Sequence, residues 1–152
     1  VLGIVTGMVA GLGTITPASG FVGPGGAVLI GFSAGIICYF ATQALKLRFR
    51  IDDSLDVFPV HGIGGILGTL LAGIFISADL GVFSGQGYAE GMAMDSQLKV
   101  QFIGVLSTLV YTAVLTFALL KLVNLMVGLR VDDEQETQGL DISQHDERGY
   151  DI

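Results

Sequence analysis

The sequence predicts an all-α integral membrane protein with a short acidic tail. Two observations carry this prediction. The 45 residues from Val1 to Leu45 hold no charged side chain, and the whole chain is 51% hydrophobic but only 14% charged. A helix or strand in water would carry charge on its outer face at its own period. Because charge is missing from every face here, we expect the surrounding solvent to be lipid.

The net charge of -7 is concentrated at one end of the chain. Residues 130–152 hold eight acidic side chains and two arginines, whereas residues 1–129 hold six acids and five bases. An acidic tail argues against binding to nucleic acid, whose phosphates need clustered Lys and Arg. It favours a tail in water that contacts a basic surface or a protein partner. With Cys38 as the single cysteine, a disulfide framework and a cysteine metal site are excluded, and no cofactor is predicted.

Proline and glycine divide the uncharged opening into two helices. The segments 16–20 and 23–26 are breaker sequences, and they separate predicted membrane helices at about 1–15 and 25–45. The second is long enough to approach the thickness of the hydrocarbon core. The first is short, and we interpret it as a membrane helix cut at its start. In both, glycines recur every fourth residue, a spacing that lets membrane helices approach closely (Gly3, Gly7, Gly11; Gly31, Gly35).

Two more membrane helices are predicted at about 57–78 and 98–129. The charged stretch 46–56 precedes the first of them, and Pro59 falls in its first turn, where a missing N–H does least harm. A Gly-, Ser- and Gln-rich loop separates the two. We therefore expect a transmembrane region at 1–129 and an acidic tail at 130–152.

The basic residues orient these helices. Lys46, Arg48 and Arg50 follow the second helix, and Lys121 and Arg130 end the fourth, which places them on one side of the membrane. The opposite side has a single lysine. By the positive-inside rule the tail is expected to be cytoplasmic.

His61 is the one titratable side chain in the 57–78 helix. At about 100° per residue, a group of mostly small residues shares its side of the helix, and large aliphatic residues occupy the other. The group near His61 comprises Val57, Gly64, Gly65, Gly68, Ala72 and Phe75. Neighbouring backbone or a narrow conduit could come close to such a face. A buried histidine that only locks packing is the alternative, but an ionisable group inside a span favours function.

The chemistry of imidazole narrows that function. A neutral imidazole can donate and accept a proton at once. Moving a bare cation into low dielectric costs on the order of 20 kcal/mol, so a histidine midway could help a protonatable species cross. Further metal ligands at ligand spacing are missing from this helix, and no serine has a G-x-S-x-G setting. An enzyme is therefore not predicted.

The segment from Asp52 to Gly65 resembles the signature D-D-x-x-D-V-F-x-V-H-G-x-G-G of the ammonium transporter family, the Amt–Mep–Rh group. Residues 16–20 resemble its T-P-A-x-G turn, and the tail resembles the cytoplasmic C-terminus of the Amt branch. The tail positions that match are Gly139, Leu140, Asp141, His145, Glu147 and Tyr150.

This resemblance implies the last four helices of an eleven-helix homotrimeric channel for ammonium or ammonia, with methylammonium as a further substrate, in the cell membrane. His61 would be the second histidine of a central pair, and Thr16 and Val57 would lie near the lower pore. The pore-helix motif would include Asp53, Asp56, Gly62, Gly64 and Gly65. A PII-type signalling protein would dock near the tail. The alternative is a non-transporting ammonium sensor or scaffold that acts through its tail.

Overall fold

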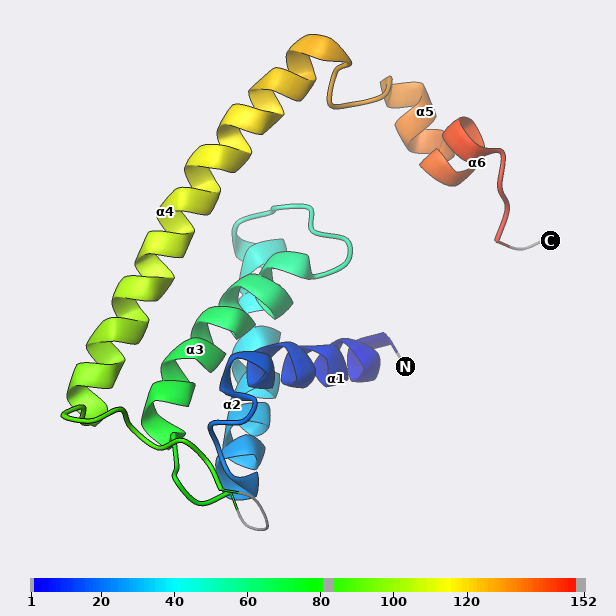
Figure 1. Ribbon diagram of the computed structural model, residues 1–152. Helices are drawn as coiled ribbons and strands as arrows, with labels where there is room; N and C mark the ends of the chain where they lie inside the picture. Colours follow the sequence, from blue (N-terminus) through cyan, green and yellow to red (C-terminus); the bar gives the residue numbers. More distant parts are fainter. Residues whose placement is uncertain (1, 81–83, 150–152) are drawn as a thin grey trace. The chain divides into compact units, whose positions relative to one another are not determined.

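The computed structural model describes residues 2–80 and 84–149, and within those ranges it contains helices and two isolated bridges but no strand. This confirms the all-α prediction. Figure 1 gives the order of the helices along the chain. The contacts divide the chain into two units, residues 1–107 and 108–152, which are described separately.

The first unit opens with two helices joined by a tight turn. α1 is Leu2–Ile15, followed by the 3-10 turn η1, Thr16–Ala18. Gly20 has a φ of 81°, a conformation open to glycine, and it lies in the turn between the two helices. α2 then runs Pro24–Gln43 with its proline in the first turn. A π-helical turn, η2, Ala44–Arg48, extends α2.

The histidine-bearing helix begins with another π-helical turn. η3 is Phe58–Ile63 and continues directly into α3, Gly64–Phe75. Pro59 lacks the N–H that an α-helical turn uses, and the wider turn surrounds it. At the other end, the Tyr88 hydroxyl donates to the Gly73 carbonyl at 3.0 Å. Tyr88 thus satisfies a carbonyl that the end of the helix leaves free.

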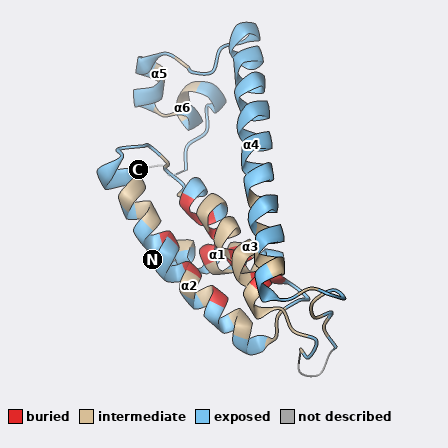
Figure 2. Cartoon of the chain, turned by 90° about the vertical axis from the view of Figure 1, so that its left-hand side faces the viewer, coloured by how far each residue is buried: buried red, intermediate tan, exposed pale blue. Residues whose placement is uncertain are grey.

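α4, Met94–Met126, is the longest helix, and none of its residues, all of them described, is buried. Its 33 residues correspond to a length of about 50 Å. Figure 2 shows exposed residues along almost the whole helix. Near its start, the side chains of Gln97 and Gln101 lie against Gly73 of α3.

Within the described residues, three helices are long and apolar enough to cross a membrane: Pro24–Arg48, Phe58–Phe75 and Met94–Met126. The apolar segment Gly3–Ala18 is shorter. The chain is therefore a membrane protein. That α1 is a further span stays an expectation from the sequence.

The tightest contact in the first unit lies between α1 and α3. A β-carbon built on Gly68 would overlap the carbonyl oxygen of Thr14, and one built on Gly64 would lie 2.7 Å from the Thr14 hydroxyl oxygen and 3.4 Å from the Cys38 sulfur. Two small clusters of buried residues flank this contact. They are Ala10, Cys38 and Val60 on one side, and Ala18, Ile30 and Ala72 on the other.

The glycines with regular spacing in α1 and α2 do not make this contact. No described atom lies within 4 Å of a β-carbon built on Gly3, Gly7, Gly11, Gly31 or Gly35. Among the glycines of the described helices, Gly64 and Gly68 of α3 leave the least room for a β-carbon, whereas β-carbons on Gly26 and Gly73 would meet side chains of neighbouring helices at 3.1 and 3.2 Å.

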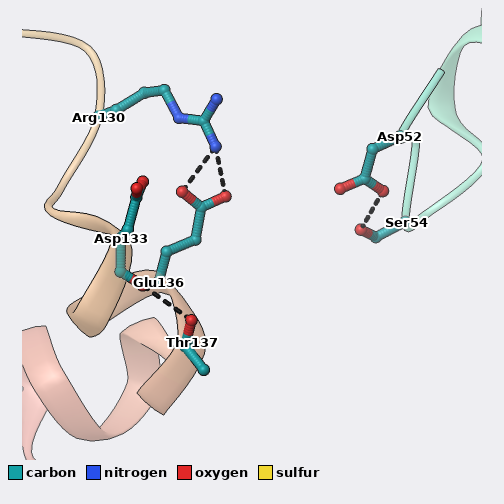
Figure 3. A network of polar contacts seen from close by, with 6 residues as sticks. All are labelled: Asp52, Ser54, Arg130, Asp133, Glu136 and Thr137. Atoms are coloured by element: carbon teal, nitrogen blue, oxygen red, sulfur yellow. Dashed lines mark hydrogen bonds and ion pairs between the residues drawn. The ribbon is translucent and has the colours of Figure 1, made fainter.

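The second unit holds the rest of α4 and two short helices, α5, Asp133–Gln138, and α6, Leu140–His145. Arg130 donates to both carboxylate oxygens of Glu136 (Figure 3), at 2.5 and 2.6 Å. Gly139, with a φ of 101°, makes the bend between the two helices. The Ser143 hydroxyl donates across that bend to the Gln135 carbonyl.

Replacing Gly68 by alanine should destabilise the protein, because its new methyl group would overlap backbone that cannot rotate away. We expect a loss of about 1–3 kcal/mol, the usual range for overpacking, measured by thermal unfolding in detergent. The matched control is Gly65→Ala on the same helix, where no described atom lies within 4 Å of the new methyl group. Equal stability of the two variants would contradict the proposed contact.

Candidate functional site

His61 lies in η3 and is exposed in the single chain. Its side chain borders an open hollow of about 570 Å³. Val57, the other residue of this helix predicted to contact substrate, lines the same hollow. The remaining lining residues are Leu45, Ile51, Asp52, Asp53, Phe58 and Gly62.

The ring of His61 lies against α1. A β-carbon built on Gly13 would be 3.8 Å from Nδ1 of His61 and 3.8 Å from the Val60 carbonyl oxygen. An alanine at Gly13 would thus make ordinary van der Waals contact, whereas a branched side chain would displace the ring. Gly13 therefore helps to define the space that the histidine occupies.

Asp53 caps the start of the histidine-bearing helix. Its carboxylate oxygens accept hydrogen bonds from the backbone N–H groups of Val57 at 2.9 Å and Phe58 at 2.8 Å. The first N–H groups of a helix have no partner inside the helix, and the positive end of the helix dipole favours an anion there. Asp53 meets both needs.

Asp56 binds a different element. Its Oδ1 lies 2.6 Å from Nζ of Lys46, in the turn that extends α2. The Asp56 side chain is 17% exposed and that of Lys46 40%. The pair borders a cavity of about 310 Å³ between α1, α2 and η3.

The glycines of the motif divide by role. Gly64 and Gly68 are buried. Gly64 lies against the side chain of Thr14, and Gly68 lies against its backbone. A β-carbon on Gly62 would lie 3.0 Å from the ring of Phe58, and no described atom lies within 4 Å of one on Gly65. Of the two uses considered for the small-residue face, Gly68 therefore serves the close approach of neighbouring backbone, and Gly64 makes room for the side chains of Thr14 and Cys38.

Thr16 lies apart from the hollow. It is exposed in η1, and its hydroxyl donates to the Leu12 carbonyl at 2.8 Å. The residues that line the hollow beside His61 do not include Thr16.

The predicted tail residues fall at the bend and end of the α5–α6 pair. Gly139 makes the bend, and Leu140 and Asp141 begin α6. His145 is exposed at the end of α6, and the Glu147 backbone N–H donates to the Asp141 carbonyl. Tyr150 lies outside the described residues.

Three residues that contact the site could not be identified from the sequence. Lys46 was considered only as a charge that orients the helices, although it binds Asp56. Gly13 and Thr14 belong to another helix, and their contacts with His61 and Gly64 depend on how α1 crosses α3. No local pattern marks such positions.

Comparisons with known proteins agree along the chain. The sequence model of the Ammonium Transporter Family matches residues 1–150. The ammonium transporter Amt1 of Archaeoglobus fulgidus is 45% identical over 150 residues, which cover 98% of this chain and 37% of that protein. An ammonium transporter of Aquifex aeolicus is 41% identical over 152 residues, 100% of this chain and 35% of that protein. The chain thus spans about a third of these relatives.

A solved structure shares the fold. The protein titled Sensor Amt Protein matches with a TM-score of 0.81 at 31% identity, covering 94% of this chain and 34% of its own.

Replacing Asp53 by alanine should cost about 1 kcal/mol of stability, the usual value of a lost helix cap, because two backbone N–H groups lose their acceptors. Chemical unfolding in detergent would measure this loss. The control is Asp52→Ala, since Asp52 is exposed and accepts a hydrogen bond from the Ser54 hydroxyl (Figure 3). A control loss as large as that of the cap variant would argue against capping.

Proposed function

Because this chain belongs to the ammonium transporter family, we propose that it forms part of a membrane transporter for ammonium or ammonia, and not of an enzyme. The observation that carries the proposal is the match over residues 1–150, which includes the segment from Asp53 to Gly65. That segment forms the capped start of the helix with His61 at its hollow.

We propose that His61 assists the passage of the substrate. A bare cation faces an idealised cost of on the order of 20 kcal/mol in low dielectric. An imidazole beside the path lowers that barrier if it accepts a proton or solvates the species that crosses. Val57 would line the same path, since it shares the hollow. Thr16 would act elsewhere along the path, because it does not line that hollow.

We also propose an orientation, a location and partners for the transporter. The basic residues near the ends of α2 and α4 favour a cytoplasmic position for the 46–56 loop and the tail. We propose the cell membrane as the location, a homotrimer as the assembly and a PII-type signalling protein as the partner of the tail. Methylammonium would be a second substrate.

The test replaces His61 by alanine in a chimera that joins this chain to the remaining part of the Archaeoglobus fulgidus transporter. Uptake of labelled methylammonium should fall by about tenfold or more, since a positioned proton-transfer group contributes at least that much. The matched control is His145→Ala, because His145 is exposed in the second unit. Full uptake by the His61 variant would refute the role of His61 in the pore.

The alternative is an ammonium sensor or scaffold, which the likeness to the Sensor Amt Protein favours. Deleting residues 130–152 from the chimera separates the two functions. A transporter should keep measurable uptake, and only its regulation by a PII-type protein should be lost. A sensor would show no uptake with or without the tail, and the deletion would abolish partner binding in a pull-down.

A further inference from the structure

We propose that Lys46 and Asp56 form a positioning pair that fixes where the His61 helix begins relative to the end of α2. This inference rests on the proposed function, since it assigns the pair an effect on transport through His61. Neither residue borders the hollow beside His61, so the pair would act through the helix and not by touching the substrate.

The pair joins the end of α2 to the segment just before the His61 helix. Lys46 lies in the π-helical turn η2 that ends α2, and Asp56 lies two residues before η3. Their charged atoms are 2.6 Å apart, with the carboxylate only 17% exposed. Partial burial weakens screening by water and salt, so a pair in this setting holds its geometry better than a surface pair.

Asp56 connects the ion pair directly to the start of the His61 helix. Its φ of 56° lies in the left-handed region, which few residues other than glycine adopt and in which aspartate is enriched. Its carbonyl accepts the backbone N–H of Val60 at 3.1 Å, and His61 is the next residue. A change in the position of Asp56 therefore moves the turn that carries the imidazole.

A cavity lies beside the pair. Its volume is about 310 Å³, and residues of α1, α2 and η3 line it. Small residues such as Gly7, Ala10 and Gly35 line it. The contact of 2.6 Å between Lys46 and Asp56 is a direct connection at the border of this cavity.

Asp53 serves a separate purpose. Its carboxylate bonds to Val57 and Phe58, so it holds the helix start within its own segment. Lys46, in contrast, connects that start to α2. Asp53 and Asp56 thus have different partners, and their loss should have different consequences.

The experiment uses the chimera with Lys46→Met, Asp56→Asn and both together. Methionine keeps much of the length of lysine, and asparagine tolerates the left-handed backbone of Asp56. Each single change should lower the maximal rate of methylammonium uptake about tenfold, as small displacements of a working group do, at unchanged KM and thermal stability. The double variant should be no worse than either single variant, and Lys46→Arg should retain most of the uptake.

A second measurement follows His61 without relying on transport. Diethyl pyrocarbonate modifies accessible imidazoles, and mass spectrometry gives the rate at His61 relative to the exposed His145. Both single variants should change that ratio. The matched control is Asp95→Asn, which breaks the ion pair with Lys99 at 3.7 Å whose side chains are 76% and 75% exposed. It should change neither uptake nor the ratio.

The outcomes separate this inference from the proposed function. An unchanged His61 ratio in both single variants would overturn the positioning pair, even if the parent chimera transports and His61→Ala does not. So would a loss of uptake that merely follows a loss of thermal stability. A folded parent without uptake, whose His61 ratio still responds to Lys46→Met, would refute the proposed function and leave the pair standing.

Discussion

The contact between the glycine face of α3 and the Thr14 backbone of α1 is the constraint on which the first unit depends. At Gly68 the two backbones leave no room for a β-carbon. In a lipid solvent, apolar burial does not favour one helix partner over another, so close van der Waals packing of this kind decides which helices associate. This contact fixes Thr14, and it therefore also holds the preceding residue, Gly13, beside His61. His61 lies about two helical turns before Gly68.

Polar side chains have different partners inside the helices and at the helix ends. Within the spans, the hydroxyls of Ser33 and Thr69 donate to backbone carbonyls four residues earlier, so these two polar side chains are satisfied within their own helices. The carboxylates and the lysine lie where the His61 helix begins. Charge therefore anchors the end of the helix, and glycine contacts fix its middle.

More of the fold than of the site could be predicted from the sequence. The absence of charge from Val1 to Leu45 and the proline and glycine breakers were enough to predict helices, because solvent and backbone chemistry act locally. The hydrophobic period also predicted a small-residue face around His61, which the structure uses at Gly64 and Gly68. The regularly spaced glycines of α1 were a weaker guide, since spacing does not say which partner, if any, lies opposite. Lys46 could not be paired with Asp56 from sequence, because that contact depends on how α2 returns beside η3.

The length of the signature segment has a physical explanation. Within nine residues, Asp53 caps two N–H groups, Asp56 turns the chain through a left-handed conformation and binds Lys46, and Pro59 occupies a wide first turn. His61 then emerges at the hollow. Each of these steps sets the direction of the next, so a change at any one of them alters where the imidazole lies. A helix start that must place one side chain this closely therefore constrains every residue that leads up to it, and a family sharing that start would share a long motif and not a lone histidine.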